Sequence, residues 1–220
     1  DASKGFVKEG KNNKLRECDI KRIADTVRDR KTVPGYSRTV SRDEIRQNGY
    51  NLNIPRYVDS SDPVEKFDIY ATMFGGIPHS EIDELQKYWD TFPSLREELF
   101  IADADKPYSQ LKTEDTQSFI EQNADVKAFQ QMFAQAFGGF ADSVHHRLID
   151  QIATANPQKE LDAISDDIFA RLHGMPLIDR YAAYQALADN WQGITNDIET
   201  IQQEGIEAVR VVEPAYKLVK

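Results

Sequence analysis

The feature that most constrains this fold is a run of segments with helical periodicity, separated by breaks rich in glycine and proline. After about residue 112, apolar residues recur every three or four positions, and the pattern stops at Gly138-Gly139, Asn156-Pro157 and Gly174-Met175-Pro176. Glycine and proline end helices, so these breaks predict an array of four helices in a mainly α fold. The predicted helices span roughly residues 113–137, 140–154, 157–173 and 176–203.

The last predicted helix carries a regular apolar seam whose members alternate three and four residues apart. A 3.5-residue period keeps one face of a helix against a neighbouring helix along its length. The seam runs for under three heptads, so two interpretations stay open: packing inside the chain's own bundle, or docking onto a partner protein. Its members are Tyr184, Leu187, Trp191, Ile194, Ile198 and Ile201.

A small α/β patch is predicted at the N-terminus. Apolar residues at helical spacing indicate a helix over about residues 17–30, followed by a short strand over 36–40. Ser41 and Glu44 form a capping-box pattern for a short helix that ends near Gly49. Residues 52–58 then read as a second strand.

From residue 60 onward we expect helices without strands, including one over 80–89 with Ser80 as its N-cap. The exception is a short β hairpin predicted in residues 209–219, near the C-terminus. The predicted organisation is a tail of an upstream domain (1–60), a helical connector (61–111) and a C-terminal helical docking domain (112–220). Asp1 opens without a methionine, so we expect the chain to be cut from a longer polypeptide at both ends.

Charge is distributed unevenly in a chain whose net charge is -10. Residues 1–50 hold 13 Lys and Arg against 8 Asp and Glu, whereas the other 170 residues hold 14 against 29. The basic end is suited to phosphate and the acidic remainder to solvent or protein, although both can be ordinary solvated faces. No apolar run is long enough for a membrane span or a signal peptide, which predicts a cytoplasmic protein.

The sequence holds no pattern for bond making or metal binding. It lacks a glycine-rich phosphate loop and an HExxH pair, and Cys18 has no second thiol. His145 and His146 are adjacent and point about 100° apart on a helix, which suits one metal poorly. Asn156-Pro157-Gln158 lacks the second proline and the aromatic residue of the adenine methyltransferase motif [DNS]-P-P-[YFW]. We interpret Asn156 as a helix N-cap and predict neither catalytic residues nor a metal site.

Three blocks, in order, carry a resemblance to a known family. The first comprises Asp1 to Phe6, Lys11 to Arg16 and the helix Asp19 to Arg30. The second runs from Gly35-Tyr36-Ser37-Arg38 to Asn51-Leu52-Asn53-Ile54-Pro55-Arg56-Tyr57-Val58, and the third from Gly75-Gly76-Ile77-Pro78 to Phe92-Pro93-Ser94-Leu95-Arg96. Together they resemble the modification subunit of type I restriction-modification systems, an N6-adenine DNA methyltransferase.

The resemblance implies a division of labour in which this chain is inactive alone. The S-adenosylmethionine motif and the [DNS]-P-P-[YFW] motif of the family belong upstream of Asp1, so no cofactor is expected in this chain. The implied partners are the specificity subunit, the restriction subunit and double-stranded DNA, with no membrane. The alternative is a helical protein-protein interaction module that makes no contact with nucleic acid.

Site residues follow from the same reasoning. The residues expected to contact the DNA backbone are Lys4, Lys11, Asn12, Asn13, Lys14, Arg16, Arg38 and Arg56. The residues that carry the family motif are Asn51, Asn53, Pro55, Arg56 and Tyr57. A solvated loop is the alternative for the basic cluster, and an edge strand fixed by asparagine side chains is the alternative for the motif.

Overall fold

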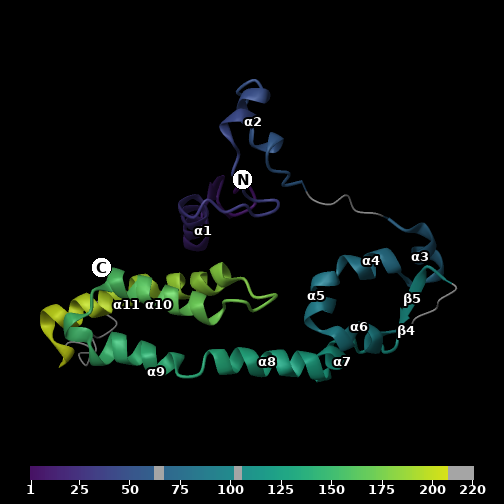
Figure 1. Ribbon diagram of the computed structural model, residues 1–220. Coiled ribbons are helices and arrows are strands. Elements are labelled where there is room, and N and C mark those ends of the chain that lie inside the picture. Colours follow the sequence, from purple (N-terminus) through teal and green to yellow (C-terminus); the bar gives the residue numbers. More distant parts are fainter. Residues whose placement is uncertain (62–66, 102–105, 208–220) are drawn as a thin grey trace. The chain divides into compact units, whose positions relative to one another are not determined.

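The computed structural model describes residues 1–61, 67–101 and 106–207, and confirms a mainly α fold with small strand patches (Figure 1). The chain forms two compact units that are each assembled from separate stretches of sequence. The first unit contains residues 1–64, 152–168 and 179–220, and the second contains 65–151 and 169–178. The predicted division into 1–60, 61–111 and 112–220 concerns functional segments and stays a prediction.

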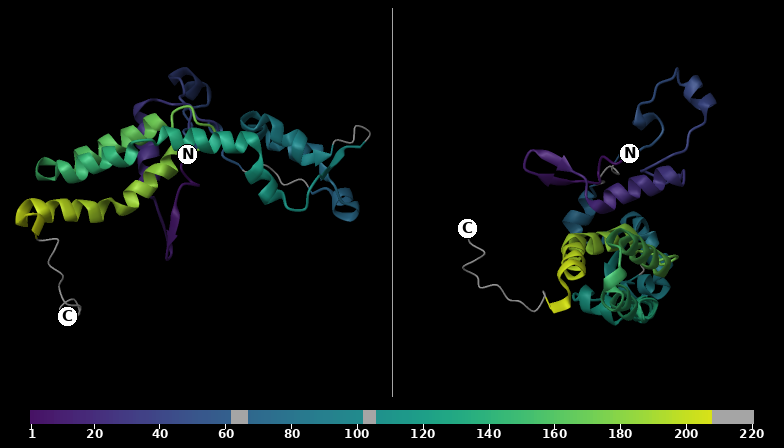
Figure 2. Two further views of the ribbon diagram at one scale, coloured as in Figure 1. Left: turned by 90° about the horizontal axis from the view of Figure 1, so that it is seen from below. Right: turned by 90° about the vertical axis from the view of Figure 1, so that its left-hand side faces the viewer.

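The first unit begins with a two-stranded hairpin and a helix. Strands β1 (Val7–Glu9) and β2 (Asn12–Lys14) pair antiparallel, with Val7 opposite Lys14. Gly10 opens the two-residue turn with a φ of 63°, a conformation that glycine adopts without steric cost. The hairpin projects from the helix that follows it (Figure 2).

Helix α1 (Glu17–Arg28) confirms the first predicted helix, but its faces are reversed relative to a typical amphipathic helix. Cys18, Asp25 and Thr26 are buried, whereas Ile20 is 47% and Val27 is 72% exposed. Polar contacts to helix α11 (Arg180–Glu204) determine this orientation: the side chain of Gln185 accepts a hydrogen bond from the Cys18 amide at 2.9 Å.

The two strands predicted over 36–40 and 52–58 are wrong. Pro34-Gly35 folds the chain back so tightly that the Val33 amide donates to the Ser37 carbonyl at 2.8 Å, which leaves only an isolated bridge. At the second site, the Asn51 side chain accepts from the Asn53 amide at 2.9 Å and starts a turn, and η1 (Ile54–Arg56) is a 3-10 helix. Between them, α2 (Arg42–Gln47) is confirmed, with Ser41 Oγ accepting from the Glu44 amide.

The last two helices of the predicted array match their predicted positions with changes at the ends. Helix α10 (Pro157–Arg171) runs from the first unit into the second, and Asn156 Oδ1 accepts from the Lys159 amide at 3.1 Å, as its N-cap role requires. Helix α11 begins at Arg180 behind the N-cap Asp179. Near its C-terminal end, Gln202 donates to the carbonyls of Ile152 and Ala155 and so ties α11 to η3 (Ile152–Thr154).

The second unit contains short helices around a three-stranded sheet, although the sequence predicted no strands here. Strand β5 (Tyr108–Leu111) lies between β3 (Ile77–Pro78) and β4 (Phe100–Ile101), antiparallel to both. The helix predicted over 80–89 is divided at Leu85. Its first half begins at His79, directly after the strand, so the expected Ser80 cap is wrong. The short helices are α3 (Ile69–Phe74), α4 (His79–Glu84), α5 (Gln86–Thr91), α6 (Pro93–Leu99) and α7 (Thr116–Gln122).

The core of the second unit is a cluster of Ile82, Trp89, Phe92 and Leu95. Buried Asn123 lies beside it and divides the predicted helix 113–137 into α7 and α8 (Ala124–Ala136). Its Oδ1 caps α8, and its Nδ2 donates to Ser94 and Glu98. The predicted helix 140–154 becomes α9 (Phe140–His145), the π-helix η2 (His146–Asp150) and η3. The predicted C-terminal hairpin lies outside the described residues.

Candidate nucleic-acid interface

The β1–β2 hairpin brings four of the expected backbone-contact residues together on an exposed surface. Lys11 lies in its turn, and Asn12, Asn13 and Lys14 form β2, where every side chain is exposed. Lys14 Nζ lies 3.3 Å from Glu9 Oε1, in an ion pair exposed on both sides. Within the described part of the chain, the side chains of Lys11, Asn12 and Asn13 have no protein partner, so their donors are open to a ligand.

Arg16 lies next to these residues but is engaged in a local network. Its guanidinium donates to the Asp19 carboxylate at 2.9 and 3.1 Å, and Asp19 Oδ2 accepts from the Arg16 amide at 3.0 Å. The hydrogen bond from Arg16 holds the pKa of Asp19 below its usual value, against the opposing effect of burial. Asp19 also lies against Gly5, where an added Cβ would be 3.0 Å from Oδ1. Arg16 therefore caps α1 and fixes the base of the hairpin.

Lys4, Arg38 and Arg56 extend the basic surface along the first unit to different degrees. Lys4 is exposed in the turn before β1, and Arg38 is paired with Glu44 at 2.9 Å. Arg56 is exposed at the end of η1, and its guanidinium has no protein partner within the described ranges. The structure thus places Lys11 and Arg56 as open cations and Arg16 and Arg38 as paired ones.

The family motif forms a loop, residues Asn51 to Arg56, which we call the motif loop. It is fixed by its own polar groups. The Tyr57 hydroxyl donates to the Asn51 carbonyl at 2.5 Å, and Pro55 takes an early position in η1, where a missing amide donor costs little. The alternative to a contact role was an irregular edge strand fixed by asparagine side chains. The Asn51 side chain does fix the loop, but residues 52–58 form no strand, because Ile54–Arg56 is a 3-10 helix. Leu52 is 70% and Ile54 50% exposed.

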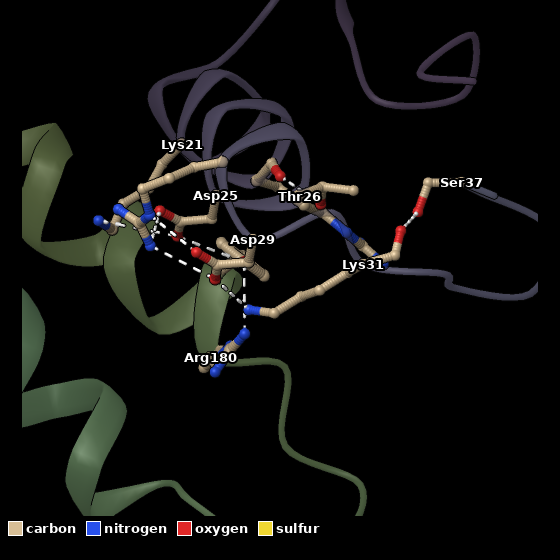
Figure 3. Close-up of polar contacts among 10 residues, drawn as sticks. Lys21, Asp25, Thr26, Asp29, Lys31, Ser37 and Arg180 are labelled. Atoms are coloured by element: carbon tan, nitrogen blue, oxygen red, sulfur yellow. Dashed lines mark hydrogen bonds and ion pairs between the residues drawn. The ribbon is translucent and has the colours of Figure 1, made fainter. Parts of the chain in front are cut away.

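The cations of α1 that face α11 are engaged by carboxylates (Figure 3). Asp25 is 5% exposed and lies 3.1 Å from Arg28, 3.8 Å from Lys21 and 3.4 Å from the Tyr181 hydroxyl, which donates to it. Asp29 pairs with Arg28 at 2.8 Å and with Lys31 at 2.6 Å, and hydrogen bonds from Arg28 and then Lys31 lower its pKa. Of these contacts, the hydrogen bond from Tyr181 to Asp25 joins α11 to α1.

The seam of α11 is largely covered by the chain itself. Tyr184, Trp191 and Ile198 are buried, at seven-residue spacing. Leu187, Ile194 and Ile201 are half-buried. This burial favours packing within the chain for the first three, and docking onto a partner stays a prediction for the other three.

The described ranges hold neither a membrane-spanning helix nor a metal-binding cluster. No helix in residues 1–61, 67–101 and 106–207 is both long and apolar enough to span a bilayer. The same ranges contain no group of three or more His, Cys, Asp or Glu side chains arranged to hold a metal ion. His146 instead lies 3.1 Å from Asp150 on the exposed η2.

Sequence reasoning missed the hairpin and the exposed apolar tip of the motif loop. The hairpin left one signal, Gly10 followed by Lys11 between two short stretches that could pair. The exposure of Leu52 and Ile54 left no signal in the sequence, because a half-buried strand also carries aliphatic residues two positions apart.

Replacing Asp19 by Asn should lower the free energy of unfolding by about 1–2 kcal/mol at pH 7, because the α1 cap and the Arg16 ion pair are both weakened. The pKa of Asp19 is lower in the folded state, so its contribution is present above the unfolded pKa of about 3.9 and lost as the pH falls through the folded pKa. The difference between wild type and Asp19→Asn should therefore shrink below pH 4 in urea titrations. Asp43→Asn, at an exposed ion pair, is the matched control, and an effect of Asp19→Asn that does not change with pH would contradict the assignment.

Comparison with known proteins finds similarity in the N-terminal part of the chain. The family model described as N-6 DNA Methylase matches residues 1–66. The type I restriction enzyme MpnII methylase subunit of Mycoplasma pneumoniae is 38% identical over 69 residues, which is 31% of this chain and 13% of that protein. The MjaVIII methylase subunit of Methanocaldococcus jannaschii is 35% identical over 87 residues, 39% of this chain and 14% of that protein.

The MjaVII methylase subunit of the same archaeon is 39% identical over 57 residues, 26% of this chain and 10% of that protein. The similar segment thus spans only 10–14% of the length of these relatives. No solved structure matches the chain. The β1–β2 hairpin, α1 and the motif loop all lie inside the matched residues. Residues 1–66 of this chain are therefore similar to a segment of the N-6 DNA methylase family and of type I restriction enzyme methylase subunits.

Proposed function

We propose that this chain serves a type I restriction-modification methylase subunit as a non-catalytic part that contacts the DNA backbone and joins subunits. One observation carries the proposal: the segment shared with methylase subunits folds into an exposed hairpin with free amine and amide donors. Phosphate contacts of this kind fix the register and orientation of a protein on DNA without reading bases. The assigned residues are Lys4, Lys11, Asn12, Asn13, Lys14, Arg16, Arg38 and Arg56.

The electrostatics support a weak, salt-dependent contact. Each lysine that neutralises a phosphate releases a counterion, so binding strengthens as the salt concentration falls. The excess of 13 basic over 8 acidic residues in positions 1–50 favours DNA, whereas 29 acidic against 14 basic residues elsewhere repel it. DNA is therefore expected at the hairpin and the motif loop and not along the acidic helices.

We expect the methyl donor of the whole enzyme to be S-adenosylmethionine, and in the described part of this chain the hollow beside its N-terminus does not suit that molecule. A hollow of about 300 Å³ beside Asp1 and Asp19 offers two carboxylates, but both are engaged. Asp1 accepts from the Ser3 amide and the Ser60 hydroxyl, and Asp19 accepts from Arg16. Both carboxylates thus serve contacts within the chain, and the glycine-rich loop that such a cofactor needs is absent from the sequence.

The chain alone is accordingly expected to transfer no methyl group. Incubation with duplex DNA and S-adenosylmethionine that carries a labelled methyl group should leave the DNA unlabelled above a protein-free blank. A whole methylase subunit of the family serves as the positive control. Labelling by this chain would contradict the non-catalytic assignment.

Neutralising the hairpin should weaken DNA binding. In Lys11→Gln/Lys14→Gln, affinity for duplex DNA at low salt should fall about tenfold, and the slope of log affinity against log salt should lessen by about 2. Arg16 is left intact because it holds the α1 cap. Fluorescence anisotropy of a labelled duplex measures both quantities.

The matched control for the hairpin variant is Lys127→Gln/Lys159→Gln, which makes the same charge change at exposed helical positions. Equal losses in the two double variants would show that net charge, and not the hairpin, governs binding. If the wild-type chain binds no duplex even at low salt, the alternative of a helical interaction module without nucleic-acid contact is favoured.

Subunit assembly is assigned to the half-buried part of the α11 seam, with the specificity and restriction subunits as the partners. Leu187→Asp/Ile201→Asp should reduce capture of a co-expressed specificity subunit at least tenfold, because charge is placed in an apolar contact. Gln203→Asp, exposed on the same helix, is the control. Leu187→Ala is a milder change that separates docking from folding. If this variant folds and captures the specificity subunit normally while the double variant unfolds, the seam is internal core and not a docking surface.

A further inference from the structure

The motif loop, residues Asn51 to Arg56, exposes aliphatic side chains at its tip. Leu52 is 70% exposed and Ile54 50%, and the loop lines a hollow with its own residues. Single exposed leucines are common on protein surfaces, but here two lie two residues apart on a short projecting loop. The question is what such a tip contacts.

The loop is held in one conformation before any ligand arrives. Gly49 and Tyr50 both have positive φ, 63° and 60°, and the second value is uncommon for a residue other than glycine. The Tyr57 hydroxyl donates to the Asn51 carbonyl, and the Val58 amide donates to the Ile54 carbonyl at 2.9 Å. A loop fixed in this way loses little conformational entropy on binding.

The surroundings of the tip favour DNA over an apolar protein face. Asn53 lies between the two aliphatic residues, Arg56 follows them, and both polar side chains are exposed. A protein-docking face would be expected to present a larger continuous apolar area. Alternating aliphatic, amide and guanidinium groups instead match a groove whose floor holds base edges and whose walls are phosphates.

We propose that the motif loop enters the minor groove of duplex DNA and that Leu52, supported by Ile54, wedges between adjacent base pairs. Minor-groove proteins use leucine, isoleucine and proline in this way, partly unstacking a base step. Arg56 contacts a flanking phosphate, and Asn53 faces the acceptors of the groove floor. The inference rests on the proposed DNA contact and adds to it the place and the manner of contact.

The wedge gives the loop a sequence preference that the hairpin lacks. Pyrimidine–purine steps such as TA unstack most easily, so insertion there costs least. Lysines that contact phosphates do not discriminate between sequences. Binding by the hairpin and insertion by the loop are thus separable in experiment.

The test uses the full chain and short duplexes that carry 2-aminopurine at a central TA step, since this base brightens when it loses its stacking partner. Saturating wild-type chain at low salt should raise the fluorescence of the TA duplex several-fold. In a duplex whose central step is stiff and flanked by G·C pairs, the rise should be less than half as large. Leu52→Ala/Ile54→Ala should lose most of the rise while anisotropy shows that its affinity for the duplex falls less than fivefold.

Val27→Ala is the matched control, because Val27 is an aliphatic residue of similar exposure (72%, against 70% for Leu52) on α1, away from the loop. Circular dichroism checks that both variants fold, and truncation of exposed side chains is expected to leave the fold intact. Leu52→Met, which retains an aliphatic wedge, should keep the fluorescence rise.

The outcomes distinguish failure of the wedge from failure of the proposed function. Normal duplex binding without a fluorescence rise, or with a rise that survives in Leu52→Ala/Ile54→Ala, overturns the wedge and leaves the DNA-contact proposal standing. A fluorescence rise that survives in Leu52→Ala/Ile54→Ala would favour a protein partner for the loop. No binding of the wild-type chain to any duplex overturns both.

Discussion

The rest of the first unit depends on one buried carboxylate, Asp25, which α1 directs toward α11. Burying a charge is costly unless it is paired, and Asp25 meets Arg28, Lys21 and the Tyr181 hydroxyl. This pairing turns the polar side of α1 inward and leaves the apolar side, with Ile20 and Val27, facing outward. It also engages Lys21 and Arg28 of α1, whereas Lys11 on the hairpin and Arg56 on the motif loop stay open within the described residues.

The sequence predicted those parts of the fold where a local signal has only one structural meaning. Ser41 before α2 and Asn156 before α10 act as predicted, because a side-chain cap depends on the next three residues alone. The α1 orientation could not be predicted: its apolar spacing indicated a buried face, but the helix is oriented by Asp25 and Gln185, and Gln185 lies 167 residues from Cys18. Tertiary contacts of this range leave no trace in a local pattern.

The candidate site shows the same division. The basic character of residues 1–50 was readable as composition, and all eight expected contact residues lie in the first unit. The sequence could not show which of these cations lack an ion-pair partner. Arg16 pairs with Asp19, and Arg38 with Glu44, only in the folded chain. The strand predicted over 52–58 failed because one asparagine side chain, at position 51, replaces a strand partner as the acceptor for a backbone amide.

Asp19 has a mechanical consequence, since it joins three parts of the chain at one point. Its carboxylate holds Arg16 at the base of the hairpin, starts α1 and lies against Gly5 so closely that a larger residue would be pushed away. A substitution at Gly5, Arg16 or Asp19 would therefore disturb the base of the hairpin and the start of α1 together.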